Sequence, residues 1–130
     1  MPHFHIDYSP NLEERIDMAA FCDCIRVAAL ETGVFPAAGI RVRALRADYV
    51  TMADGNPDHA YIDLSIRLRA GRPADAKAKA TQHIFDAAQA FCADLLNSSS
   101  LMLSLEMRDI DPDLAPKTSS IRRYLTEDHT

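Results

Sequence analysis

The feature that most constrains the fold is a strand–helix–strand pattern that occurs twice along the chain. Residues 3–8 alternate apolar and polar side chains, a long apolar-striped stretch follows, and residues 40–47 alternate again. The same order returns with an alternating run over 60–68, a helical stripe after Pro73 and a last alternating run over 101–107. The two halves, about 1–48 and 59–110, share this order with little sequence identity, so they indicate a structural repeat.

Each half predicts a right-handed crossover that joins two parallel strands. Two such units predict an α+β fold, in which a four-stranded mixed sheet carries two helices on one face. The opposite sheet face would be bare in a monomer, and the first helical stripe is wider than one sheet face requires. We therefore expect a single domain over residues 1–130, with a tail from residue 111, that assembles with copies of itself.

Capping residues set the expected limits of the helices. Either Ser9 or Asn11 is expected to cap the first helix, which ends near Thr32 because Gly33 suits a left-handed C-terminal position. Pro73 is expected as the first residue of the second helix, which runs to about 97–99. Beyond the last strand we expect an extended acidic segment and a short helix over about 119–125.

Composition narrows the range of partners. The net charge is −5 and no basic run is present, which argues against nucleic acid. No segment has the length of a membrane span or the pattern of a signal peptide, so we expect no membrane association and a cytoplasmic location. The three cysteines, Cys22, Cys24 and Cys92, are expected to be reduced and to pack in the core.

Pro2 is the first candidate for chemistry. It has the same phase as Phe4 and Ile6, so its side chain should point to the apolar side of the first strand. Removal of Met1 would leave Pro2 with a free secondary amine, which is a titratable base. In the simpler alternative, Pro2 only begins an edge strand, where its missing N–H costs nothing.

Two arginines are candidates for binding an anion. Arg41 follows Gly39 at the start of the second strand and shares a strand face with Arg43. Arg72 lies at the N-terminal edge of the second helix, where backbone N–H groups and the helix dipole favour negative charge. A guanidinium group can hold a carboxylate through two hydrogen bonds. The alternative for each is a solvated surface arginine.

His3, His5 and Asp7 share the polar face of the first strand, and their spacing could hold a metal ion. A half-exposed polar strand face or a subunit contact has the same pattern, and we expect no metal. No Ser/His/Asp or Cys/His arrangement follows from the spacing of the residues.

Five short blocks in order resemble one enzyme family: Pro2–Phe4, Thr32–Pro36, Ala38–Arg41, Met52–Gly55 and Ala70–Arg72. They are similar to the 5-carboxymethyl-2-hydroxymuconate Δ-isomerase family of the tautomerase superfamily, and the similarity extends from Pro2 to about Asp111. It implies a homotrimer of subunits with two β-α-β units each, and no metal or organic cofactor. It also implies Pro2 as the catalytic base, with Arg41 and Arg72 binding the carboxylates of a small polycarboxylate substrate.

The implied reaction belongs to aromatic catabolism, in the homoprotocatechuate pathway. It moves a carbon–carbon double bond in an unsaturated 2-hydroxy or 2-oxo polycarboxylate by an allylic proton shift. Burial beside Phe4 and the positive charges of Arg41 and Arg72 would lower the pKa of the Pro2 amine. Two alternatives are a different activity of the superfamily (phenylpyruvate tautomerase, dehalogenase or decarboxylase) and a non-catalytic trimeric binding protein.

Overall fold

The computed structural model describes residues 2–126. Its four strands are β1 (His3–Tyr8), β2 (Arg41–Arg46), β3 (Ala60–Arg69) and β4 (Leu101–Ile110), and they form one sheet in the order β2-β1-β3-β4. β1 is parallel to β2 and antiparallel to β3, and β3 is parallel to β4. The sheet is therefore mixed, as predicted.

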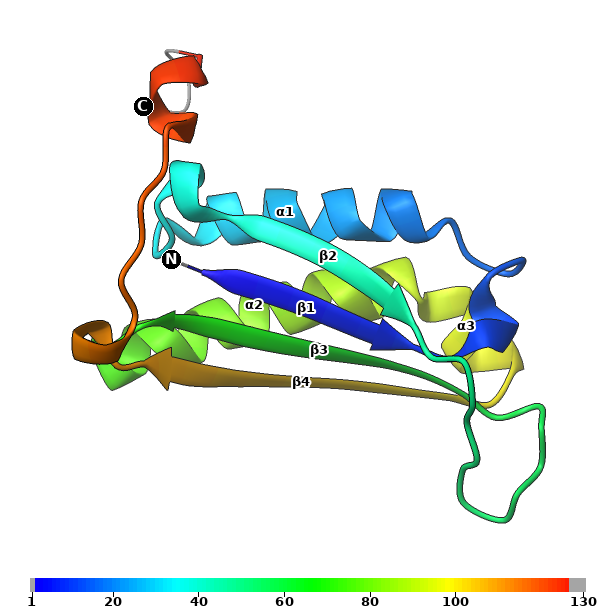
Figure 1. Ribbon diagram of the computed structural model, residues 1–130. Helices are drawn as coiled ribbons and strands as arrows, with labels where there is room; N and C mark the ends of the chain where they lie inside the picture. Colours follow the sequence, from blue (N-terminus) through cyan, green and yellow to red (C-terminus); the bar gives the residue numbers. More distant parts are fainter. Residues whose placement is uncertain (1, 127–130) are drawn as a thin grey trace.

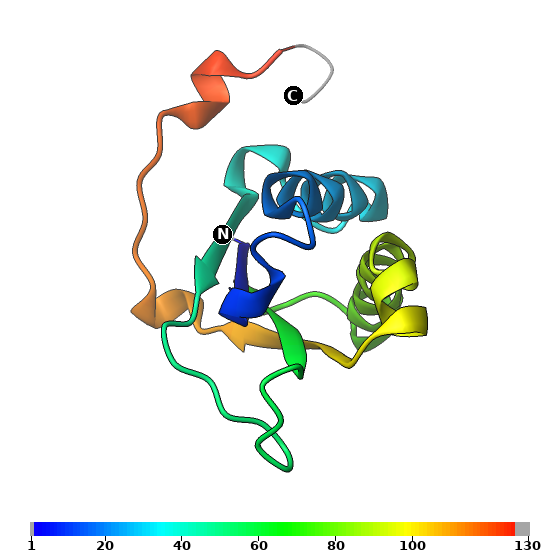
Figure 2. The ribbon, with the colours of Figure 1, turned by 90° about the vertical axis from the view of Figure 1, so that its right-hand side faces the viewer.

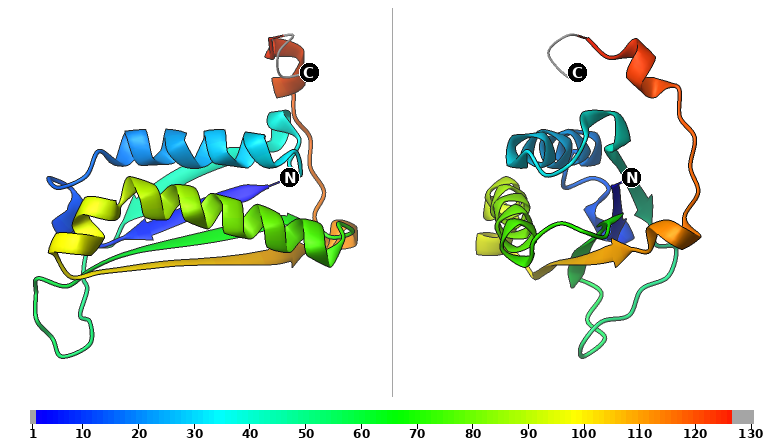
Figure 3. Two further views of the ribbon diagram at one scale, coloured as in Figure 1. Left: turned by 180° about the vertical axis from the view of Figure 1, so that it is seen from behind. Right: turned by 90° about the vertical axis from the view of Figure 1, so that its left-hand side faces the viewer.

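Three helices, α1 (Met18–Thr32), α2 (Ala74–Phe91) and the short α3 (Ala93–Ser98), lie on one face of the sheet (Figures 1 and 3). Alternate strand residues point at these helices and are buried with them. The core includes Phe4, Ile6, Phe21, Ile25, Ile62, Leu64, Ile66, Ile84 and Cys92. This two-layer arrangement, seen end-on in Figure 2, confirms the predicted α+β fold.

The other sheet face is polar, and its charge changes sign along the strands. At the end where β1 begins, the strand register aligns a basic row that consists of Arg41, His3, Arg67 and Arg108. Towards the other end, Asp7 of β1 pairs with Asp63 of β3. The open face therefore presents positive charge beside Pro2 and negative charge at its far end.

The first helix starts later than predicted. Pro10–Leu12 forms a 3-10 helix, and α1 begins at Met18 behind the cap residue Asp17, whose carboxylate accepts a hydrogen bond from the N–H of Ala20. Ser9 precedes the 3-10 helix as its cap residue, with Pro10 first as predicted, but neither predicted cap residue caps α1, and both side chains make long-range contacts. The hydroxyl of Ser9 accepts a hydrogen bond from the N–H of Tyr61.

The side-chain amide of Asn11 donates to the backbone carbonyls of Pro57 and His59, so it ties the 3-10 helix to a distant loop. The C-terminal prediction for α1 is confirmed, because Gly33 adopts the left-handed conformation with φ 69°.

Three boundaries in the second half also differ from the prediction. Pro73 is the cap residue of α2 rather than its first residue, and the helix is interrupted at Cys92 before α3 continues to Ser98. β4 extends to Ile110, three residues further than expected, because its register with β3 continues to the pair Arg69–Ile110.

After β4 the tail contains two short 3-10 helices, η3 (Pro112–Leu114) and η4 (Ile121–Tyr124), where a longer extended segment and a helix over 119–125 were expected. The tail runs from the end of β4 to the region of the 3-10 turn η2 (Ala37–Gly39), which precedes β2 (Figure 1). No helix among residues 2–126 is both long enough and apolar enough to cross a membrane.

Candidate active site

Pro2 lies directly before β1, and its side chain is completely buried. The side chain is therefore on the apolar side of the sheet, as its phase with Phe4 predicted. The ring of Phe4 packs edge-on against that of Phe35, with ring centroids 5.1 Å apart. The edge-strand alternative is wrong, because β1 has neighbours on both sides; the proline fits because it precedes the first paired residue.

Arg41 is the first residue of β2 and is paired with His3 in the register of the parallel strands. Its side chain is exposed on the open face of the sheet. The Nε–H group donates to the carbonyl oxygen of Gly39 at 3.3 Å, and Nη2 lies 3.2 Å from Nε2 of His3. Arg41 is therefore held beside the residue that follows Pro2.

His3 lies between two guanidinium groups. Nδ1 of its ring is 3.3 Å from Nη1 of Arg43, while Nε2 faces Arg41. A guanidinium group only donates hydrogen bonds, and a neutral imidazole has a single acceptor nitrogen, so only one of these contacts can be a hydrogen bond at a time. Burial, followed by the charges of Arg41, Arg67 and Arg43, lowers the pKa of His3 to about 4. The neutral ring is favoured because protonation would place another positive charge in a cationic cluster.

Arg72 lies in the turn between β3 and α2, where Gly71 adopts a positive φ of 118°. Its Nε–H and Nη2–H groups donate to the carbonyl oxygen of Val34, and its Nη1–H group donates to the carbonyl oxygen of Arg69. The half-buried side chain thus joins the β3–α2 turn to the loop before β2. Because β3 is antiparallel to β1, this turn lies at the end of the sheet where Pro2 and Arg41 are found.

Two members of the first-strand trio, His3 and Asp7, have side-chain partners other than a metal ion. His3 faces arginines, which repel a cation, and the Asp7 carboxylate accepts a hydrogen bond from the hydroxyl of Tyr61 at 2.6 Å. Among residues 2–126 no group of three His, Cys, Asp or Glu side chains is arranged to hold a metal ion. Phase alone showed that His3 and Arg41 occupy polar strand faces, but their contact depends on the pairing of β1 with β2.

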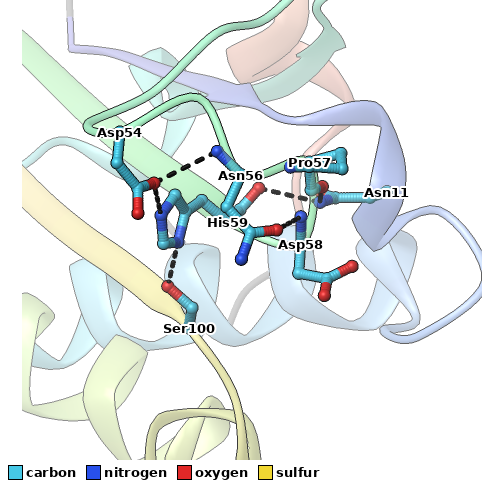
Figure 4. A network of polar contacts seen from close by, with 7 residues as sticks. All are labelled: Asn11, Asp54, Asn56, Pro57, Asp58, His59 and Ser100. Carbon is cyan, nitrogen blue, oxygen red and sulfur yellow. Dashed lines mark hydrogen bonds and ion pairs between the residues drawn. The ribbon is translucent and has the colours of Figure 1, made fainter.

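A second polar network, which the sequence did not indicate, closes the loop before β3 (Figure 4). The Nε2 atom of His59 is 2.7 Å from an oxygen of Asp54, and its Nδ1 atom is 2.6 Å from the hydroxyl of Ser100. These three side chains follow the order of a hydrolase triad. However, the Asp54 side chain is 74% exposed, so water screens its charge. The network instead fastens the loop, which contains the family-like block Met52–Gly55, to the start of β4.

Solved structures place this fold in a known class. The chain superposes on a structure described as native fused 4-OT with a TM-score of 0.65 at 16% sequence identity, covering 93% of this chain and 97% of the other. A structure described as a member of the cis-3-chloroacrylic acid dehalogenase family gives a TM-score of 0.61 at 18% identity, covering 88% of this chain and 79% of the other. At these identities the likeness establishes the fold alone, and this fold matches the tautomerase fold that the sequence blocks implied.

The particular family follows from closer matches. A family model described as 5-carboxymethyl-2-hydroxymuconate isomerase matches residues 2–125. The 5-carboxymethyl-2-hydroxymuconate Delta-isomerase of Escherichia coli is 32% identical over 121 residues, which are 93% of this chain and 96% of that protein. A 5-carboxymethyl-2-hydroxymuconate isomerase structure from Deinococcus radiodurans R1 superposes with a TM-score of 0.87 at 27% identity, covering 96% and 95% of the two chains. The chain therefore belongs to the 5-carboxymethyl-2-hydroxymuconate isomerase family, which confirms the resemblance seen in its sequence blocks.

Proposed function

We propose that this protein is an isomerase that moves a carbon–carbon double bond in 5-carboxymethyl-2-hydroxymuconate or a closely related unsaturated polycarboxylate, in the cytoplasmic degradation of aromatic compounds. Membership of the isomerase family over residues 2–125 supports the reaction class. The observation that carries the proposal is the position of Pro2, which is buried at the start of a central strand, next to a histidine that lies between two arginines.

The proposed base is the secondary amine of Pro2 after removal of Met1. A base for an allylic proton shift must take a proton from one carbon and return it to another, so it must be uncharged at the working pH. The environment of Pro2 favours an uncharged amine, because apolar burial and nearby positive charge both oppose ammonium formation. The neighbouring His3, on the open face of the sheet, is in a cationic environment of this kind, since burial and arginine charges lower its pKa to about 4.

Arg41 and Arg72 are the proposed ligands of the substrate carboxylates. Arg41 is exposed, and its Nη1 atom makes no hydrogen bond with any residue in the part of the chain that the structure describes. Both arginines would stabilise the negative charge that develops on the dienolate as the proton leaves carbon.

Although the whole chain has a net charge of −5, a local group of arginines attracts an anionic substrate. No metal or organic cofactor takes part in the proposed reaction.

We also propose a homotrimer. The open sheet face carries two apolar side chains with large exposed fractions, Leu45 (52%) and Met102 (62%). They lie on the same face as the basic row and the acidic pair Asp7–Asp63. The opposite signs at the two ends of this face would suit pairing of one end with the other end of a second copy.

An ultraviolet assay with three substrates tests the function. We expect 5-carboxymethyl-2-hydroxymuconate to be converted with the highest kcat/KM, ahead of 2-hydroxymuconate and phenylenolpyruvate. Preference for phenylenolpyruvate would favour the phenylpyruvate tautomerase alternative, and turnover of none of the three would favour a non-catalytic binding protein.

The Pro2→Ala variant tests the residue. We expect kcat to fall by about 10²-fold or more, within the range that general base catalysis contributes, while the oligomer is retained. Pro10→Ala, at an exposed proline, serves as the matched control. Intact-mass measurement of the active protein should show loss of Met1, because an amide nitrogen at Pro2 has no basic lone pair. Full activity with Met1 attached would contradict the mechanism.

A further inference from the structure

We propose that Lys117 and Arg122 of the C-terminal tail form a second anion-binding subsite beside Arg41, which binds the third carboxylate of a tricarboxylate substrate. The identity of that substrate rests on the proposed function. A cavity and the charges that line it support the subsite itself.

The cavity lies between the tail and the turn that leads into β2, and its volume is about 360 Å³. This volume is at the lower end of the range for small-molecule pockets. The turn contributes Gly39 and Arg41 to its lining, and the tail contributes Lys117, Ile121 and Arg122. Arg41 connects this cavity to the candidate active site, because the same guanidinium group contacts His3.

The cavity concentrates positive charge, and no acidic side chain among residues 2–126 lines it. Three of its lining residues are cationic, in a chain whose net charge is −5. Within residues 2–126 the side chains of Lys117 and Arg122 form no ion pair or hydrogen bond, whereas Arg26, Lys77 and Arg108 each pair with a carboxylate. Unpaired cations that line one cavity are suited to an anionic ligand.

Apolar side chains of the tail face the end of α1 and the turn before β2 across a second cavity. Ile121 and Leu125 line this cavity of about 260 Å³ together with Leu30 and Ile40. The η4 turn therefore sits over the end of α1 and the turn before β2, and it carries Arg122 with it (Figure 3). Because Ile121 and Leu125 line this second cavity, Lys117 and Arg122 can line the first one, where a ligand can reach them.

The chemistry of the substrate calls for such a subsite. Muconate is a dicarboxylate, and its 5-carboxymethyl substituent adds a third carboxylate. Arg41 and Arg72 can account for two carboxylates, and three nitrogens of Arg72 already donate to backbone carbonyls. Lys117 and Arg122, which line the same cavity as Arg41, supply the additional donors. The tail therefore distinguishes tricarboxylates from dicarboxylates such as 2-hydroxymuconate.

Calorimetric titration with two saturated acids, tricarballylate and glutarate, tests the subsite without turnover. We expect the double variant Lys117→Gln/Arg122→Gln to bind tricarballylate about tenfold or more weakly, the effect of losing one or two charge-assisted hydrogen bonds, with a smaller loss for glutarate. The matched control is Lys79→Gln/Arg123→Gln, which removes the same charges from exposed positions outside this cavity. Its affinity for both acids should match that of the wild type.

Equal losses for the two acids, or no loss, would overturn the subsite. Equal effects of the double variant and its control would overturn it too, because they would show a general effect of net charge. The result is separable from the proposed function: a protein that discriminates the two acids but turns over no muconate derivative would overturn the isomerase assignment alone. An active isomerase whose double variant keeps the wild-type preference between 5-carboxymethyl-2-hydroxymuconate and 2-hydroxymuconate would overturn the subsite alone.

Discussion

The guanidinium group of Arg41 and the imidazole ring of His3 are in direct contact across the parallel pair β1–β2, with Nη2 and Nε2 3.2 Å apart. Arg43 approaches the other ring nitrogen of His3, so the ring is placed between two donors. This relationship concentrates positive charge beside Pro2, and it gives the end of the sheet a measurable response to pH.

Acidification should destabilise the folded protein through His3. Burial and the charges of Arg41, Arg67 and Arg43 lower its pKa from 6.5 to about 4. Between these values the unfolded chain binds a proton at His3 that the folded chain does not, so the free energy of unfolding falls as pH decreases through this window. Because the ring is partly exposed, we expect a loss on the order of 1 kcal/mol.

Urea unfolding of wild type and His3→Gln, at about pH 7 and about pH 4.5, measures this effect. The variant should lose less stability on acidification than the wild type. His83→Gln, which removes an exposed histidine paired with Glu31 outside the arginine cluster, is the control for loss of an imidazole elsewhere. An unchanged difference between the two pH values in His3→Gln would show that His3 does not couple to folding.

Substitution of Arg41 should weaken catalysis without unfolding the protein. Arg41→Gln removes an exposed side chain that we expect to bind a substrate carboxylate, so kcat/KM should fall about 10- to 100-fold, the effect of one lost charged hydrogen-bonding partner. Arg46→Gln, at the other end of β2, is the matched control. Steady-state kinetics measure kcat/KM of both variants. Similar kcat/KM values for the two would show that Arg41 does not bind the substrate.

Substitution of Arg72 should affect both stability and substrate binding. Arg72→Gln removes the donors to the carbonyl oxygens of Val34 and Arg69, and we expect a loss of about 1–2 kcal/mol in the free energy of unfolding. If Arg72 also binds a carboxylate, KM rises at temperatures where the variant is fully folded. Thermal unfolding together with kinetics separates these effects, and a destabilised variant with wild-type KM would leave Arg72 with a structural role alone.

The His59 network should control the order of the loop before β3. His59→Ala removes the contacts with Asp54 and Ser100, so we expect a loss of about 1–2 kcal/mol in the free energy of unfolding. Amide hydrogen exchange over residues 54–59 should accelerate, because Asn56 and His59 backbone groups are held in the same loop (Figure 4). His83→Ala is the control for loss of an exposed histidine, and unchanged exchange in the His59 variant would contradict the role of the network.

The predicted start of the first helix was wrong because capping preferences of single residues do not take long-range contacts into account. Ser9 and Asn11 are residue types that commonly cap helices. However, the Ser9 hydroxyl accepts a hydrogen bond from the N–H of Tyr61, and the Asn11 amide donates to the carbonyl oxygen of His59. The first long helix, α1, therefore begins only after Asp17. Gly33 ended α1 as expected, because a left-handed glycine is a local requirement that no distant partner contests. The caps failed because a polar side chain binds whichever partner the tertiary fold brings near.

The amino-acid sequence by itself determined the two strand–helix–strand units, the apolar side of each strand and the burial of Pro2, because alternation and helical periodicity are properties of neighbouring residues. Its short blocks also indicated the family. Only the tertiary structure decided that β1 is a central strand and that His3 contacts Arg41 and Arg43. It also decided that Lys117 and Arg122 of the tail line the same cavity as Arg41. These relationships depend on strand register and on packing between segments far apart in the chain, which bury the apolar face of the sheet and thereby fix which polar residues meet on the other.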